Sequence, residues 1–198
     1  MAELIDELIG IVGAKGVLTG ADVAARPASW LRPEPSRAKA IVRPANTEEV
    51  AAVMKLCHAA GQAVIPVGGN TGLVEGATAG EDDILLSLER MSAVESLDET
   101  GCTMTVQAGV PLHTVQERAA DADLMFPVDF GARGSAQIGG AISTNAGGNA
   151  VIRYGMMREQ VLGLEAVLAD GTVVSSMNRL LKNNAGYDLK QLFIGTEG

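Results

Sequence analysis

The sequence predicts an α+β fold with two lobes: a small βαβ lobe, then a lobe with an antiparallel sheet and helices. Within residues 40–88, two apolar segments flank an amphipathic helical pattern and a third apolar segment follows, which is the order of a βαβ unit. Beyond residue 91, apolar segments are joined in pairs by short polar turns, a pattern typical of hairpins. The 198 residues, 47% of them hydrophobic, suffice for one large domain or two small lobes.

Residues 1–36 are expected to form a helical and then extended N-terminal segment. The apolar residues between Leu4 and Val12 fall on one helical stripe that ends in glycines. The stretch from Trp30 to Ser36 contains prolines and has no periodicity, which predicts an extended connection.

The first lobe is expected over residues 37–90. A strand at Ala40–Arg43 is stopped by Pro44, and apolar strands follow at 63–67 and 84–88. Asn46 and Glu49 have the N-cap and N3 spacing of a capping box, which predicts a helix from about Thr47 to Ala60.

The second lobe is expected over residues 91–198. Segments 94–97 and 103–108 flank a polar turn and predict a hairpin, and Pro111 opens a helix. The Asp170-Gly171 pair between 161–168 and 172–175 predicts a second hairpin.

Charge and composition exclude several classes of function. A net charge of −9 argues against nucleic acid as a partner. The cysteines Cys57 and Cys102 and the histidines His58 and His113 are too few and too scattered for a disulfide scaffold or a metal site, and we expect no metal. We assign Cys57 to the core and both histidines to surface or capping positions. An acidic N-terminus and uncharged stretches broken by polar residues predict a cytoplasmic protein without a signal peptide or transmembrane segment.

Two glycine clusters are the candidate binding regions. The first comprises Pro66, Val67, Gly68, Gly69, Asn70, Thr71, Gly72 and Leu73, directly after a predicted strand. Ligands bind at that end of strands in α/β units, and an uncharged loop can hold a diphosphate through its amides. A tight turn that needs positive φ at two glycines is the structural alternative. The second cluster, residues 131–155, has seven glycines among small polar residues and would suit a buried polar ligand.

Familiar competing motifs are missing from the sequence. It contains no G-x-G-x-x-G, no Walker A lysine, no G-x-S-x-G serine and no H-E-x-x-H. A Rossmann dinucleotide site is therefore disfavoured, and so are the hydrolase and metalloprotease classes.

The order of these blocks resembles a known family. Pro66–Leu73, Phe126–Asp129, Gly134–Ser135, Ile138–Gly140, Thr144–Gly148, Arg153–Gly155, Lys182–Leu189 and Ile194–Gly198 are similar to the FAD-binding domain of FAD-linked 2-hydroxyacid dehydrogenases. This is the vanillyl-alcohol oxidase type, in the branch with D-lactate dehydrogenase, the glycolate oxidase flavoprotein subunit and D-2-hydroxyglutarate dehydrogenase. The similarity runs from about Ala40 to the last residue.

The resemblance implies noncovalent FAD as the cofactor, because Asn70 occupies the position at which some relatives attach FAD through a histidine. The diphosphate would lie on Gly68–Gly72 and on Gly139 and Gly140. The full set of implied cofactor-binding residues is Pro66, Val67, Gly68, Gly69, Asn70, Thr71, Gly72, Leu73, Pro127, Asp129, Ser135, Ile138, Gly139, Gly140, Thr144, Asn145, Gly147, Gly148, Tyr154, Gly155, Glu197 and Gly198. Relatives often have Asn where this sequence has Ala141, so one cofactor hydrogen bond would be lost.

The implied reaction is hydride transfer from C2 of a D-2-hydroxy acid to flavin N5, with the 2-oxo acid as product. Catalytic residues and a substrate domain are expected beyond Gly198, so the chain would carry only the cofactor half. Reoxidation by an electron-transfer flavoprotein or a quinone is expected, and the oligomeric state is left open. Two alternatives remain: a flavoenzyme like the NADPH-dependent UDP-N-acetylenolpyruvoylglucosamine reductase, and a non-catalytic nucleotide-binding module.

Overall fold

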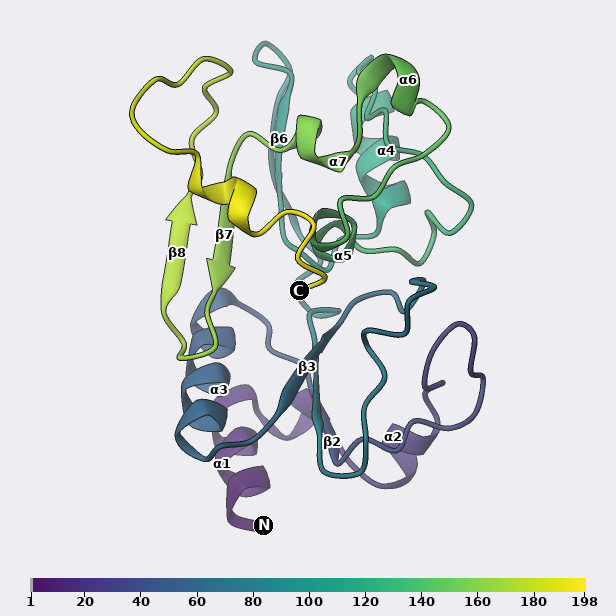
Figure 1. The fold of residues 1–198 in the computed structure, drawn as a ribbon, viewed down its shortest axis with the longest axis vertical. Helices are drawn as coiled ribbons and strands as arrows, with labels where there is room; N and C mark the ends of the chain where they lie inside the picture. Colours follow the sequence, from purple (N-terminus) through teal and green to yellow (C-terminus); the bar gives the residue numbers. More distant parts are fainter. Residues whose placement is uncertain (1) are drawn as a thin grey trace. The chain divides into compact units, whose positions relative to one another are not determined.

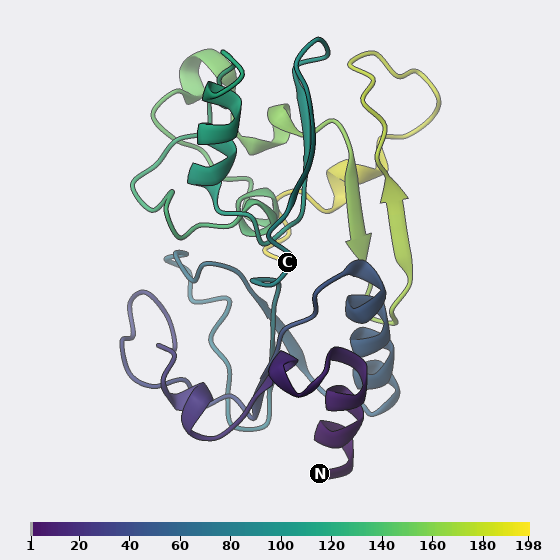
Figure 2. The ribbon, with the colours of Figure 1, turned by 180° about the vertical axis from the view of Figure 1, so that it is seen from behind.

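The computed structural model describes residues 2–198 and contains two compact units, drawn in Figure 1 and, from behind, in Figure 2. The first unit comprises the chain up to Met91 together with Val167–Val174, and the second comprises Ser92–Ala166 and Ser175–Gly198. Helices and strands occur in both units, so the predicted α+β class is confirmed.

A four-stranded sheet forms the centre of the first unit. Its order is β1-β2-β4-β3, with β1 antiparallel and the other three strands parallel. The strands are β1 (Val17–Leu18), β2 (Ala40–Val42), β3 (Val64–Val67) and β4 (Ile84–Ser87). The three predicted strands are confirmed, and β1 is an additional strand that pairs Val17 with Val42.

Helices cover both faces of this sheet. Alternate strand residues point to opposite sides, and these strands carry apolar residues on both, so each face needs a helix packed against it. On one face, Val42, Ile84 and Leu86 pack with residues of α1 (Ala2–Val12) and α3 (Thr47–Ala59), two helices that lie side by side in both views (Figures 1 and 2). On the other face, Ile41 and Leu85 pack with Val23 of α2 (Ala21–Ala24). A short 3₁₀ turn, η1 (Ala14–Gly16), joins α1 to β1.

The start of α3 follows from two polar side chains. Asn46 Oδ1 accepts the Glu49 amide at 2.8 Å, and Glu49 Oε2 accepts the Ala45 amide at the same distance. The first bond satisfies an amide that the first helical turn leaves unpaired, and the second ties Glu49 to the residue just before the N-cap. The predicted helix is confirmed with its end at Ala59.

The second unit combines two hairpins with short helices. The hairpins are antiparallel β5–β6, as predicted, and β7–β8, whose tip belongs to the first unit. The elements are β5 (Val94–Asp98), β6 (Thr103–Val106), α4 (Leu112–Ala120), α5 (Ile138–Ser143), α6 (Val151–Tyr154), α7 (Met157–Gln160), β7 (Leu164–Val167), β8 (Val173–Ser176) and η2 (Leu189–Leu192). Its core gathers buried residues from α4, α5, α7, the segments next to them and the C-terminal segment: Val110, Leu112, Val115, Val128, Ile138, Ala141, Met157, Val161 and Ile194.

The stretch between α2 and β2 is not simply extended, which corrects the expectation for Trp30–Ser36. Pro27 and Pro35 form an antiparallel bridge, and the Ala28 amide donates to the Glu34 carbonyl at 2.8 Å. Residues 26–36 therefore fold back on themselves as a small hairpin, which we call the N-terminal hairpin. Among residues 2–198, no helix is long and apolar enough to span a membrane.

Candidate cofactor site

The predicted site residues divide between the two units. The loop Pro66–Leu73 belongs to the first unit, and all the other implied residues belong to the second.

The loop after β3 has backbone amides without partners. Strand β3 ends at Val67, paired with Ser87 of β4, and the loop begins at its carboxyl end. Within the described chain, the backbone amides of residues 68–73 donate no hydrogen bond to another residue. Six consecutive amides in a partly exposed loop can thus be taken up by water or by an anionic ligand.

The conformation of this loop differs from the tight-turn alternative. Its left-handed residue is Asn70, with φ of 53°, whereas Gly68, Gly69 and Gly72 are not among the described glycines with positive φ. A Cβ added at Gly72 would find no atom within 4 Å. Gly72 therefore leaves space beside the backbone. The positive φ that the alternative placed on two glycines lies on Asn70, a residue type that tolerates it better than most.

In the second unit, two backbone amides at the N-terminus of α5 are already hydrogen-bonded to carbonyl groups of the chain. The Ile138 amide donates to the Val110 carbonyl at 2.9 Å, and the Gly139 amide donates to the Ala108 carbonyl at 2.7 Å. A Cβ at Gly139 would lie 2.8 Å from the Ala108 Cβ, whereas one at Gly140 would meet nothing within 4 Å. Gly139 thus serves close packing, and Gly140 borders open space.

A second close approach joins Gly148 to Asp129. A Cβ at Gly148 would stand 2.0 Å from the Asp129 carbonyl oxygen, which also accepts the Asn149 amide at 3.0 Å. The Asp129 carboxylate accepts hydrogen bonds from Gln116 Nε2 at 3.2 Å and Arg133 Nη1 at 2.9 Å. These hydrogen bonds lower the pKa of Asp129, so the carboxylate is charged at neutral pH.

The C-terminal residues of the predicted site lie at the end of α5. The Glu197 amide donates to the Ser143 carbonyl at 2.8 Å, and the Thr144 hydroxyl donates to the Gly140 carbonyl at 3.0 Å. Asn145, with φ of 47°, accepts the Arg158 amide on its Oδ1 at 2.9 Å. The structure therefore gathers Gly140, Thr144 and Glu197 at one helix.

Arg158 is a residue that the sequence analysis missed. Its guanidinium donates to the Ile194 carbonyl at 2.6 Å and to Gln191 Oε1 at 2.6 Å, so it holds the segment that leads to Glu197. Its position after the second glycine cluster gives no pattern that sequence reasoning could use.

The remaining implied residues have varied surroundings. Tyr154 ends α6 with the Arg153 guanidinium 5.2 Å from its ring centroid, and Gly155 follows with φ of 78°. Ser135 is exposed, whereas the Ile138 side chain is buried in the core. Ile138 can therefore contact a ligand only through its backbone.

A pocket elsewhere in the first unit contains none of the predicted site residues. Its volume is about 750 Å³, and it is lined by Ala28, Arg32, Glu34, Pro35, Arg37 and residues 78–82. The lining mixes both signs of charge. The unpaired amides of residues 68–73 give a clearer binding chemistry than this pocket does.

Cys57 and the two histidines lie where the sequence places them. Cys57 is buried in the α1–α3 core, and burial raises the pKa of its thiol, while His58 and His113 are exposed on helices. Among residues 2–198, no cluster of His, Cys, Asp and Glu could hold a metal ion.

A family match and individual relatives agree on the kind of protein that this chain resembles. Residues 38–176 match the family described as FAD binding domain. D-2-hydroxyglutarate dehydrogenase, mitochondrial, from Bos taurus is 47% identical over 85% of this chain and 31% of its own length. D-2-hydroxyglutarate–pyruvate transhydrogenase from Saccharomyces cerevisiae is 43% identical over 85% of this chain and 34% of its own.

The solved structure of alkyldihydroxyacetonephosphate synthase matches this chain with a TM-score of 0.85. It is 18% identical, and the match covers 100% of this chain and 37% of that one, so this likeness concerns the fold alone. The chain thus spans about a third of the length of the relatives it matches.

The comparisons also correct one expectation. The cytoplasmic localisation expected from the acidic N-terminus is wrong, because the bovine, zebrafish and rat relatives are all named as mitochondrial proteins.

Proposed function

Because the chain belongs to the FAD binding domain family, we propose that it is the cofactor-holding part of a flavin-dependent dehydrogenase that oxidises a D-2-hydroxy acid to the 2-oxo acid. The bovine and yeast relatives are named for D-2-hydroxyglutarate, which favours this dicarboxylate over D-lactate and glycolate as the substrate. The activity is proposed for the whole protein, of which this chain supplies the cofactor residues.

The observation that carries the proposal is the row of unpaired amides at residues 68–73. A diphosphate is an anion that accepts hydrogen bonds, and backbone amides can bind it without cationic side chains. The loop has no charged residue, so binding by amides is the route that its chemistry offers.

Open space at two glycines fits the same cofactor. Gly72 and Gly140 border space that a Cβ would partly fill, so a ligand can approach their backbone closely. The engaged amide of Gly139 gives this residue a packing role instead, and Gly140 is the residue of this pair that we assign to FAD. We further propose that FAD is bound noncovalently, because the amide side chain of Asn70 cannot form the histidyl bond.

When bound, FAD would supply the hydride acceptor. The residues of this chain would hold it and orient it. Asp129, charged and fixed by Gln116 and Arg133, is expected to orient a hydrogen-bond donor of the cofactor.

The experiment that tests the activity is a substrate panel on the whole protein with a redox dye as electron acceptor. Dye reduction with D-2-hydroxyglutarate, weaker reduction with D-lactate and none with the L enantiomers is the expected result. NADPH oxidation without dye reduction by any hydroxy acid would contradict the proposal and favour the reductase alternative.

The electron acceptor needs its own assay. An electron-transfer flavoprotein or a quinone is our first candidate, and pyruvate is the second because the yeast relative is named a transhydrogenase. With pyruvate as acceptor, one D-lactate should form for each 2-oxoglutarate. If dye supports turnover while pyruvate gives no D-lactate, the first candidate stands.

A further inference from the structure

The N-terminal hairpin, residues 26–36, precedes the region that matches the FAD binding domain family, which begins at residue 38. Besides the Ala28–Glu34 hydrogen bond, the Ser29 amide donates to the Arg32 carbonyl at 3.0 Å, and the Ser36 amide donates to the Arg26 carbonyl at 2.7 Å. Ser29 is buried. These bonds give the hairpin a defined shape.

Three side-chain contacts join this hairpin to the loop after β3. Arg32 Nη2 lies 2.8 Å from Glu75 Oε2, and the Ser29 hydroxyl donates to Glu75 Oε1 at 3.5 Å. Asn70 Nδ2 donates to the Pro27 carbonyl at 3.4 Å. Both ends of the segment 70–75 are therefore attached to the hairpin.

The two attached residues are also the ones with unusual backbone. Asn70 has φ of 53° and Glu75 has φ of 57°, values that residues with a Cβ adopt only against a steric cost. A glutamate in this conformation needs support from its surroundings. The contacts to Arg32, Ser29 and Pro27 are such a support, and they act on the residues that shape the loop.

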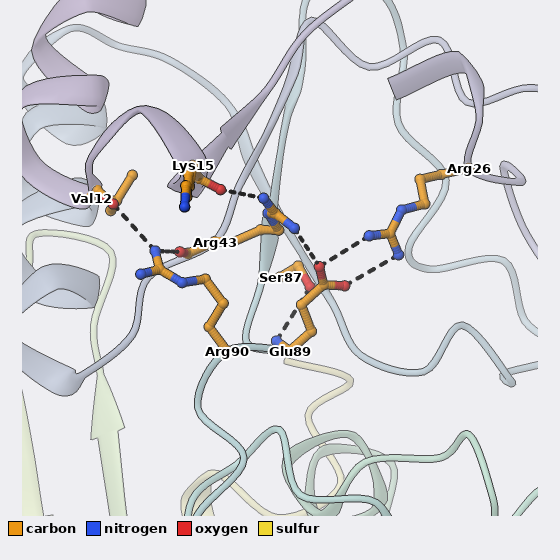
Figure 3. Close-up of polar contacts among 7 residues, drawn as sticks. All are labelled: Val12, Lys15, Arg26, Arg43, Ser87, Glu89 and Arg90. Atoms are coloured by element: carbon orange, nitrogen blue, oxygen red, sulfur yellow. Dashed lines mark hydrogen bonds and ion pairs between the residues drawn. The ribbon is translucent and has the colours of Figure 1, made fainter. Parts of the chain in front are cut away.

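The base of the hairpin is fixed to the central sheet, as Figure 3 shows. Arg26 donates to both carboxylate oxygens of Glu89, at 3.2 and 3.0 Å, and Arg43 Nη1 donates to the same carboxylate at 3.0 Å. Arg43 directly follows β2, and Glu89 lies two residues after β4. The hairpin thus connects the sheet to the loop with the unpaired amides.

We infer that the N-terminal hairpin positions the loop after β3 for FAD binding, with Arg32 and Glu75 as positioning residues that act through the backbone of residues 70–75. This inference rests on the proposed function. The ion pair holds the loop in the form that presents the amides of residues 68–73 together, so the loop need not be ordered when the diphosphate binds.

The test measures the FAD dissociation constant of the whole protein after removal of its flavin. Arg32→Gln and Glu75→Gln should each weaken FAD binding about two- to fivefold, the range expected for a partly exposed ion pair. The double variant should bind no more weakly than either single variant, because both remove one interaction. Arg32→Lys, which keeps the charge, should restore most of the affinity.

Arg37→Gln is the matched control. Arg37 pairs with Glu81 in the same unit, and both side chains are more exposed than Arg32 and Glu75. Among residues 2–198, neither Arg37 nor Glu81 forms a hydrogen bond or ion pair with residues 68–75. The unfolding midpoint of the apoprotein should be alike for Arg32→Gln and Arg37→Gln, and only the first should change FAD affinity and the visible circular dichroism of the bound flavin. Equal FAD affinity in both variants would overturn the inference, whereas absence of FAD binding by the unaltered protein would overturn the proposed function.

Discussion

Gly148 and Asp129 approach so closely that a Cβ on Gly148 would stand 2.0 Å from the Asp129 carbonyl oxygen. This contact joins the glycine segment after α5 to the segment that carries a charged, doubly hydrogen-bonded carboxylate. The backbone of one predicted site residue therefore fixes the backbone of another.

From this contact we predict that Gly148→Ala destabilises the protein. The methyl group can be accommodated only if the backbone moves, which should lower the free energy of unfolding by about 2 to 4 kcal/mol. Gly134→Ala, in the same glycine cluster but with nothing within 4 Å of its added Cβ, is the control. Urea unfolding measures both variants, and equal midpoints would show that the segment yields more easily than its contacts imply.

Substitutions at Gly139 and Gly140 should have different effects, the first on stability and the second on FAD binding. Gly139→Ala brings a methyl group within 2.8 Å of the Ala108 Cβ and should cost about 1 to 3 kcal/mol of stability. The Cβ that Gly140→Val adds meets no atom within 4 Å beyond its adjacent residues and the backbone of its own helix, so the apoprotein should stay folded while FAD binding weakens. Flavin content and apoprotein melting temperature, measured on both variants, distinguish the two effects. A Gly140→Val protein with full flavin content would remove Gly140 from the proposed site.

The Glu89 cluster gives a pH-dependent prediction. Burial alone would raise the pKa of Glu89, but hydrogen bonds and charges from Arg43 and Arg26 outweigh it and hold the pKa below its ordinary value of 4.5. The stabilisation is therefore complete above pH 4.5 and is lost as the pH falls through the lowered pKa of the folded state.

Accordingly, Glu89→Gln should lower the free energy of unfolding by about 1 kcal/mol at neutral pH, with a smaller difference in acid. Glu81→Gln is the control, because Glu81 is an exposed partner of Arg37. Denaturant unfolding at neutral pH and below pH 4.5 provides the measurement. A difference that grows in acid would contradict the assignment of the charged carboxylate as the stabilising form.

Noncovalent attachment is tested by acid precipitation of the flavin-loaded protein. With Asn70 at the attachment position, all of the yellow colour should appear in the supernatant. Colour retained in the washed pellet would show a covalent bond elsewhere in the chain.

Local signals predicted the elements that depend on neighbours in sequence. The Asn46 and Glu49 spacing gave α3 because the capping bonds are made within four residues. Asp170 and Gly171 gave the second hairpin because its turn requires positive φ, which Gly171 has at 85°.

Features that depend on distant pairing carried no such signal. Strand β1 has two residues and exists through its pairing with Ile41 and Val42. The order of the sheet, with β4 between β2 and β3, was likewise invisible in the pattern. In the candidate site, glycine frequency located the loops. It gave no sign of the hydrogen bond from the Gly139 amide to Ala108 or of the ion pair between Arg32 and Glu75, because each joins residues more than 30 positions apart.

The tip of the β7–β8 hairpin bears on how this protein is made. Val167 packs against the core of α1 and α3, and an added Cβ at Gly171 would lie 2.5 Å from the Ala51 carbonyl oxygen, so Val167–Val174 complete a unit that begins at the N-terminus. During synthesis, the first 91 residues leave the ribosome well before this tip does. The part of the α1–α3 core that Val167 covers therefore lacks this cover while the intervening 75 residues, Ser92–Ala166, are translated, an interval in which chaperones can engage it.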